Sequence, residues 1–227
     1  MEATNTPPTA PKPQNNYQDI VSYLSASKTA LTNAAFPNIA PKLAAIGYTA
    51  AEITAKLQEI ATLEALNEAQ KKEYGEQYEA TATYTATENA LHTTYINNLT
   101  IARVVFKNDV AAQVALALNG ERKKSKSGYQ AQALQFYNGV LLNANYKTIL
   151  AVRGITEAIV TSQKTGFEGL SNLEAKQKKE TGEAQAATRK RDAALDIFED
   201  WMSDFKAMAI VALSDTPQLR EQLGWKE

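Results

Sequence analysis

The sequence has no cysteine and a single histidine, His92, among its 227 residues. The absence of cysteine excludes disulfide-bonded scaffolds, thiolate metal sites and catalysis by a thiol. A single histidine excludes metal sites built from several histidines, and any histidine-based catalysis would depend on that one residue. Glu88 precedes it by four residues, but carboxylate-bridged di-metal bundles need about four carboxylates and two histidines. We therefore expect no catalytic residue, no metal site, no cofactor and no enzymatic activity.

The sequence also lacks an excess of charge and a long apolar run. Lysine and arginine number 24, aspartate and glutamate 25, and the net charge is −1, which does not fit a general nucleic-acid-binding protein. The best apolar stretch, Val110–Leu118, is too short to span a bilayer. Residues 1–16 lack the basic and apolar regions of a signal peptide. These features predict a cytoplasmic protein, or one exported without a classical signal peptide, whose partner is a second copy or another protein.

Hydrophobic residues nevertheless make up 44% of the chain, and this amount can build a real core. Alanine is abundant, and apolar residues recur at helical spacing along most of the sequence, so the predicted fold class is all-α. The exception is the segment 1–17, whose prolines at positions 7, 8, 11 and 13 fix the backbone and remove hydrogen-bond donors. We interpret it as a Pro-rich flexible arm, either a simple tail or a segment that docks on a neighbouring subunit.

The sequence repeats itself at an offset of 107 residues. Over residues 47–118, 18 of 72 positions are identical to the residue 107 places later, which is 25%. Composition alone would give roughly 6 to 9%. The strongest local match aligns QKKEYGE at 70–76 with QKKETGE at 177–183. We interpret this similarity as an internal duplication.

The duplication predicts two tandem helical repeat units and a connection between them. The first unit covers residues 18–120 and the second 129–227, and we expect the two to pack as one pseudo-symmetric body. Residues 121–128 form a polar linker by composition. The linker's basic residues, including Arg122, are interpreted as solvated.

Each unit is expected to contain one long, coiled-coil-like helix. Gly47 and Gly154 stand where a preceding helix would end, and Thr49 and Thr156 follow as N-caps. Apolar positions then follow a four-three spacing for several heptads, the pattern of a helix that packs along a partner helix. The favoured interpretation is a continuous helix in each unit, 49–107 and 156–213.

A helical hairpin with its tip at a glycine is the alternative for each long helix. Gly75 and Gly182 lie in mid-pattern, each shortly after a pair of lysines that is typical of a helix C-terminus. A glycine inside a helix also costs about 1 kcal/mol relative to alanine. Against a hairpin, the apolar phase passes both glycines without slipping, and no N-capping residue follows either one closely.

The twin QKKExGE segments are the strongest candidate for function. They could form a charged surface that contacts a partner, or a polar layer that sets the register between helices, and we favour the second interpretation. Two tryptophans, one in an apolar helical stripe and one near the C-terminus, are further candidates for an interface. The candidate interaction residues are Lys71, Lys72, Glu73, Glu76, Lys178, Lys179, Glu180, Glu183, Trp201 and Trp225.

Together these features favour a non-enzymatic structural or protein–protein interaction protein, an assembly or scaffold subunit and homo-oligomer built from duplicated helical units. The alternative is a helical-bundle module that binds a small ligand or nucleic acid between the two units.

Overall fold

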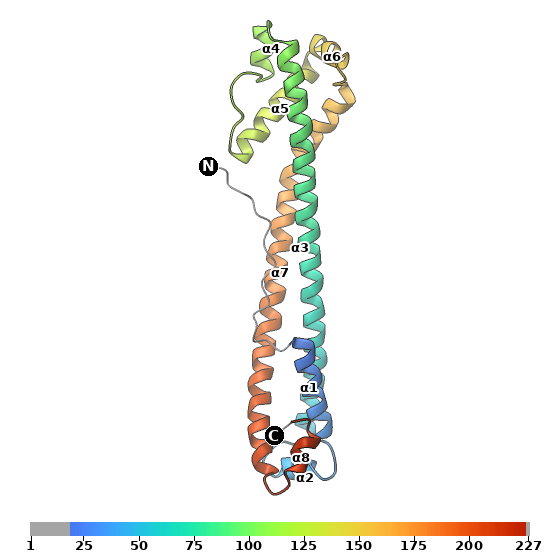
Figure 1. Cartoon of the computed structure of the whole chain (residues 1–227), viewed down its shortest axis with the longest axis vertical. Coiled ribbons are helices and arrows are strands. Elements are labelled where there is room, and N and C mark those ends of the chain that lie inside the picture. Colours follow the sequence, from blue (N-terminus) through green and yellow to red (C-terminus); the bar gives the residue numbers. More distant parts are fainter. Residues whose placement is uncertain (1–18, 226–227) are drawn as a thin grey trace. The chain divides into compact units, whose positions relative to one another are not determined.

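The computed structural model describes residues 19–225, and within that range every regular element is an α-helix and there is no strand. The predicted all-α fold class is therefore confirmed for these residues, and the Pro-rich arm at 1–17 lies outside them. The helices, labelled in Figure 1, are α1 (Ile20–Asn33), α2 (Ala40–Ala44), α3 (Ala50–Val105), α4 (Val110–Ala115), α5 (Lys126–Leu142), α6 (Ala144–Ala151), α7 (Glu157–Ala212) and α8 (Gln218–Gln222).

The two long helices are continuous. Gly75 lies inside α3 and Gly182 inside α7, so the hairpin alternative is wrong. A Cβ at either glycine would meet nothing within 4 Å. The glycines weaken the helices locally, but the apolar seam on both sides keeps its phase, and packing along that seam outweighs a propensity penalty of about 1 kcal/mol.

The start signals read from the sequence are confirmed as well. The Thr49 hydroxyl accepts a hydrogen bond from the Glu52 amide at 3.2 Å, and the Thr156 hydroxyl accepts one from the Ile159 amide at 3.4 Å. The preceding turns contain Gly47 and Gly154 at φ values of 101° and 85°, in the left-handed region that glycine adopts without strain.

The element bounds follow the same offset as the sequence similarity. Helices α3 and α7 each contain 56 residues, and both bounds of α7 lie 107 residues after those of α3. Two further residues related by this offset, Ala117 and Gly224, both have positive φ, 48° and 84°. They follow the short helices α4 and α8 and turn the chain in the same way.

Ala117 is therefore expected to gain from replacement by glycine. An alanine in the left-handed region is strained by about 1–2 kcal/mol, part of which is offset by the larger unfolded-state entropy of glycine. Ala117→Gly should raise the free energy of unfolding by about 0.5–1 kcal/mol. Urea titration followed by circular dichroism measures the change.

The matched control is the reverse substitution, Gly224→Ala. The nearest atom to an added Cβ there is Thr29 Cγ2 at 3.9 Å, an ordinary contact, so only the backbone strain remains. It should destabilise the protein by about 1 kcal/mol. A destabilising Ala117→Gly would contradict the expectation.

Contacts divide the chain into two compact units. Within the described residues, unit 1 contains residues 19–71 and 186–225, and unit 2 contains residues 72–185. Each unit takes one part of α3 and one part of α7, so neither coincides with a predicted repeat unit. Helix α5 also begins at Lys126, inside the predicted linker at 121–128.

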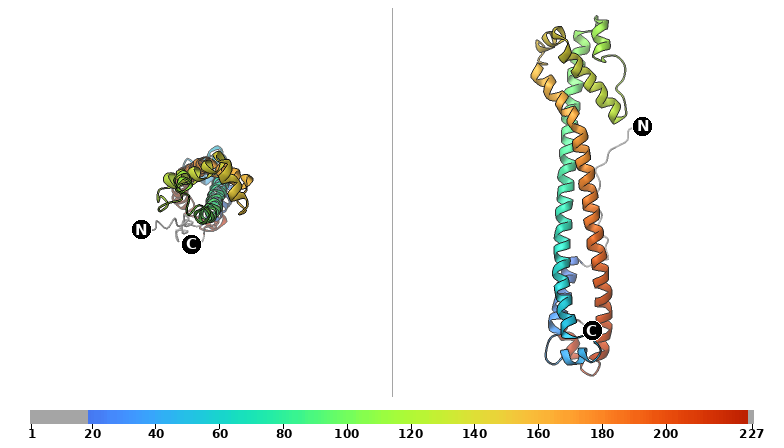
Figure 2. Two further views of the ribbon diagram at one scale, coloured as in Figure 1. Left: turned by 90° about the horizontal axis from the view of Figure 1, so that it is seen from above. Right: turned by 180° about the vertical axis from the view of Figure 1, so that it is seen from behind.

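The core of unit 1 lies where α1, α2 and α8 meet the first part of α3 and the last part of α7 (Figures 1 and 2). Phe205 of α7 is fully buried there, with Trp201 stacked on it at 5.2 Å between ring centroids. Tyr48 and Trp225 approach the same ring edge-on, at 5.1 and 5.9 Å. Other large buried residues are Leu24, Leu31, Ile39, Leu43, Ile60, Leu63, Phe198 and Leu213.

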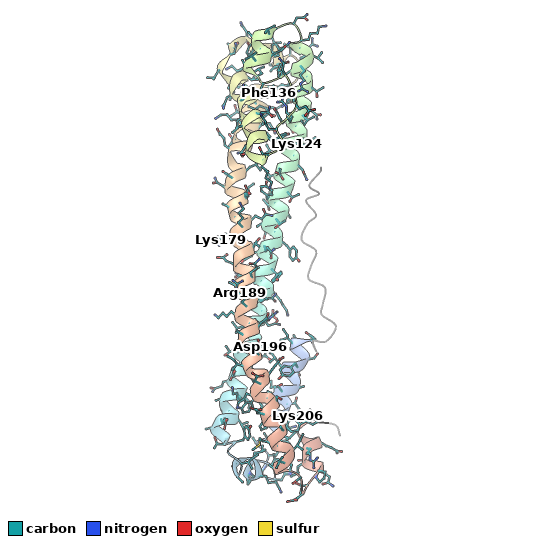
Figure 3. All side chains as sticks on the ribbon, turned by 90° about the vertical axis from the view of Figure 1, so that its left-hand side faces the viewer. Lys124, Phe136, Lys179, Arg189, Asp196 and Lys206 are labelled. Carbon is teal, nitrogen blue, oxygen red and sulfur yellow. The ribbon has the colours of Figure 1, made fainter. Side chains whose placement is uncertain are left out.

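The core of unit 2 is centred on Tyr95 of α3, whose side chain is fully buried. Its ring lies 5.9 Å from Phe136 and 5.9 Å from Phe167, and it also contacts Tyr129 and Tyr137. These partners come from α5 and α7, and Phe136 is labelled in Figure 3. Tyr95 thus connects three helices of one unit.

An arginine from the expected linker completes this core. Arg122 donates a hydrogen bond to the Tyr95 hydroxyl at 2.8 Å and another to the Ala117 carbonyl at 2.8 Å. Arg103 of α3 donates to the carbonyls of Leu118 and Gly120 at 2.7 and 2.9 Å. Our expectation that Arg122 is solvated is therefore wrong, because the connection between α4 and α5 has carbonyls that need donors.

Candidate functional site

The structure brings the twin QKKExGE segments together. Within unit 2 the relevant parts of α3 and α7 run antiparallel, since Gln177 donates to the Thr81 hydroxyl at 3.4 Å while Phe167 reaches Tyr95. Glu73 and Glu180 occupy matching positions of the two segments and belong to one carboxylate cluster. One carboxylate oxygen each from Glu73, Glu76 and Glu180 lie within 4.8 Å of one another.

Two lysines of the same segments form ion pairs with part of this cluster. Lys72 pairs with Glu76 at 3.1 Å, and Lys179 pairs with Glu183 at 2.6 Å and with Glu180 at 3.5 Å. The hydrogen bond from Lys179 lowers the pKa of the Glu183 carboxyl below its usual value. Most of these groups are exposed and screened by water, so each pair contributes little to stability, whereas the Glu180 side chain is only 10% exposed.

The chemistry of three adjacent carboxylates resembles that of a divalent-cation site. Here, however, Glu76 and Glu180 already have ammonium partners. Two of the three carboxylates are therefore already paired with ammonium groups, each within its own helix.

The remaining candidate residues lie elsewhere. Lys71 pairs with Glu68 at 2.8 Å along α3 in unit 1, and Lys178 pairs with Glu174 at 3.0 Å along α7 in unit 2. Trp201 and Trp225 belong to the aromatic cluster of unit 1 and are partly exposed. Of the candidate residues, the structure thus brings together only Lys72, Glu73, Glu76, Lys179, Glu180 and Glu183.

Unit 2 also contains a cavity that the sequence analysis did not anticipate. Its volume is about 390 Å³, and α3, α5, α7 and the segment before α5 all contribute to it. Such a volume is within the range of small-molecule sites, about 300–1,000 Å³. The lining residues are Tyr84, Glu88, Asn89, His92, Lys123, Lys124, Lys126, Tyr129, Gln130, Phe167, Leu170, Ser171 and Glu174.

The polar groups of the cavity are connected in two sets. In the first, the Tyr84 hydroxyl donates to the Glu88 carboxylate at 2.9 Å and accepts from the Lys126 ammonium at 3.1 Å. In the second, the Tyr129 hydroxyl lies 2.6 Å from His92 Nδ1. Burial raises the pKa of Tyr129 to about 12, so this hydroxyl keeps its proton at neutral pH and can donate it to the imidazole.

His92 is exposed, and its imidazole bonds to a residue 37 positions away. One signal for this site was available in the sequence, the pair Glu88 and His92 one helical turn apart. The tyrosine, phenylalanine and lysine residues that complete the cavity come from segments whose proximity no sequence spacing indicates.

No protein-family model matches the sequence, and comparisons with curated proteins and with solved structures found no match. None of the helices within residues 19–225 combines the length and apolar character needed to cross a membrane.

Proposed function

We propose that this chain is a non-enzymatic structural or protein–protein interaction protein, an assembly or scaffold subunit that associates with a second copy of itself. The observation that carries the proposal is a group of exposed apolar side chains in unit 2, at the end formed by α4, α6 and the adjoining ends of α3 and α5. Leu142 is 88% exposed and Val152 79%, and Val104, Val110 and Val114 are exposed as well. We propose that they form one contiguous patch, the kind of exposed apolar surface that marks an interaction site.

A second copy suits this surface because its residues are small, uncharged and aliphatic. Aliphatic patches without charge pair well with themselves in the isologous contacts of two-fold dimers, where the same patch serves both partners. Because these side chains carry no charge, they do not select for an acidic or a basic partner.

We further propose that the chain arose by duplication of one helical unit. The common offset of 107 residues in the bounds of α3 and α7 supports this, as do the paired backbone conformations at positions 47 and 154 and at 117 and 224. In this scheme the QKKExGE segments act as the register-setting layer. What supports this role is that the two segments face each other, with one carboxylate oxygen each from Glu73, Glu76 and Glu180 within 4.8 Å of one another.

Light scattering coupled to size-exclusion chromatography tests the assembly proposal. The purified protein should elute as a dimer or larger species that dissociates on dilution. The double variant Leu142→Lys/Val152→Lys should weaken association at least about tenfold, because two charges on a self-paired patch repel their copies.

The matched control places the same charges on exposed apolar positions of α7, Ile197→Lys/Val211→Lys. It should leave the association constant within about twofold. A strict monomer at high concentration, or equal effects of the two double variants, would refute the proposal. Deletion of residues 1–16 tests separately whether the arm docks on a neighbour, since a simple tail can be removed without effect.

A second candidate function is the binding of a small ligand, which the cavity of unit 2 supports. Its lining comes from both predicted repeat units and from the connection between them. The location, either cytoplasmic or outside the cell by export without a classical signal peptide, stays a prediction.

A further inference from the structure

We propose that the cavity of unit 2 is a binding site for a small planar aromatic anion, an aryl carboxylate or aryl phosphate. This inference deepens the second candidate function and is independent of self-association. The aromatic part would lie against the ring walls, and the anionic group would meet the lysines at the rim.

The walls are suited to a flat ring. Phe167 is buried, Leu170 is nearly so, and Tyr129 contacts Phe167 with 6.4 Å between ring centroids. Tyr84 provides a further aromatic face and is held by its bonds to Glu88 and Lys126. A planar aromatic ligand would bury apolar area against such walls and would also make edge-on or offset ring contacts. It would therefore gain more binding free energy than an aliphatic chain of equal area.

The charges of the cavity favour an anion. Three lysines line it, and among the residues that the structure describes the ammonium groups of Lys123 and Lys124 have no partner. Both lining carboxylates are already engaged, Glu88 with the Tyr84 hydroxyl and Glu174 with Lys178 at 3.0 Å. The charged groups that still lack a partner are therefore the two ammonium groups, and an anionic ligand would pair with them.

The lysine-bearing segment is held in place before any ligand binds. The Lys123 amide donates to Gln132 at 2.7 Å, and the Ser125 hydroxyl caps α5 by accepting from the Gly128 amide at 3.3 Å. Arg122 ties the start of the segment to Tyr95. Lys124, labelled in Figure 3, is thus carried by a backbone whose conformation is already set, and this lowers the entropy lost on binding.

The Lys126 ammonium already contacts an aromatic ring of the cavity. Its ammonium lies 4.9 Å from the centroid of the Tyr84 ring and bonds to the hydroxyl of that ring. An anionic group of the ligand would reach the exposed side of this ammonium without displacing either contact. The volume of about 390 Å³ suits a molecule of one or two rings and excludes a folded partner.

Isothermal titration calorimetry with the full chain tests the site, using 2-naphthoate and phenyl phosphate as probes. At least one probe should bind with a stoichiometry of one per chain and with an affinity that falls as salt is added. The neutral 2-naphthamide should bind at least about tenfold more weakly than 2-naphthoate, since it keeps the ring and loses the charge. Cyclohexanecarboxylate, which keeps the charge and loses the planar ring, should also bind more weakly.

The double variant Lys123→Gln/Lys124→Gln should weaken binding at least about tenfold. The matched control, Arg189→Gln/Lys190→Gln, removes the same net charge from the exposed surface of unit 1 and should change affinity less than about twofold. Circular dichroism checks that both variants remain folded. Failure of both probes to bind at about 1 mM, equal binding of the neutral amide, or equal effects of the two double variants would overturn the proposal. None of these outcomes bears on the oligomeric state, which is read separately by light scattering.

Discussion

Replacement of Phe205 by alanine is expected to lower the free energy of unfolding by about 3–5 kcal/mol. The side chain is fully buried at the centre of unit 1, and three aromatic rings contact it, from Tyr48, Trp201 and Trp225. Those rings come from different segments and cannot all move inward, so a cavity remains where the phenyl group was. The lost contacts and the cavity together produce the large effect.

Tryptophan fluorescence is the appropriate measurement for this variant. The chain has two tryptophans, and both contact Phe205, so their emission reports unit 1 alone. Urea titration should show a lower midpoint together with red-shifted native emission. Phe205→Leu fills most of the space and should cost about 1 kcal/mol, while Met208→Ala, at an exposed position of α7, should cost less than about 0.5 kcal/mol. A loss below about 1 kcal/mol in Phe205→Ala would show that the cluster is not a packed core.

Replacement of Tyr95 by alanine should destabilise unit 2 by at least about 3–5 kcal/mol. The ring is fully buried among four aromatic partners. The substitution also removes the hydroxyl that accepts from Arg122, whose Nε atom is itself buried without a hydrogen-bond partner. A partly buried guanidinium that loses one more acceptor adds to the cost of the cavity.

Tyr95→Phe separates the two contributions. It retains the ring and removes only the hydrogen bond to a charged group, a loss of about 1.5–3 kcal/mol. In the Arg122→Met background the same change should have a much smaller effect, because the donor is then absent. Circular dichroism during urea unfolding measures all four proteins. Equal effects of Tyr95→Phe with and without Arg122 would show that this hydrogen bond contributes nothing to stability.

Much of the secondary structure could be predicted because its causes are local. The seam of Leu63, Leu66 and their successors continues in phase past Gly75, and a continuous apolar stripe is sufficient reason for a continuous helix. Thr49 and Gly47 mark the start of that helix through their own backbone and side-chain preferences. These features depend on neighbours within a few residues, which the sequence displays directly.

The candidate sites were predictable only in part. The repeat located both QKKExGE segments, yet their approach depends on α3 and α7 being antiparallel with Glu73 near Glu180. The cavity was not predicted, since Tyr84, Tyr129 and Phe167 become neighbours only when three helices pack. Arg122 was misread for the same reason: its hydrogen-bond acceptors are created by the turn after α4.

By itself the sequence determined the helical character of the chain, the starts and continuity of its long helices, the 107-residue similarity and the absence of thiol chemistry. Hydrophobic periodicity, capping and composition act over short distances, and they require no knowledge of the fold. Only the tertiary structure decided which parts of α3 and α7 share a compact unit, which lysines have partners and where a cavity remains. Those properties depend on the packing of side chains far apart in the chain, and a linear pattern contains no measure of their distances.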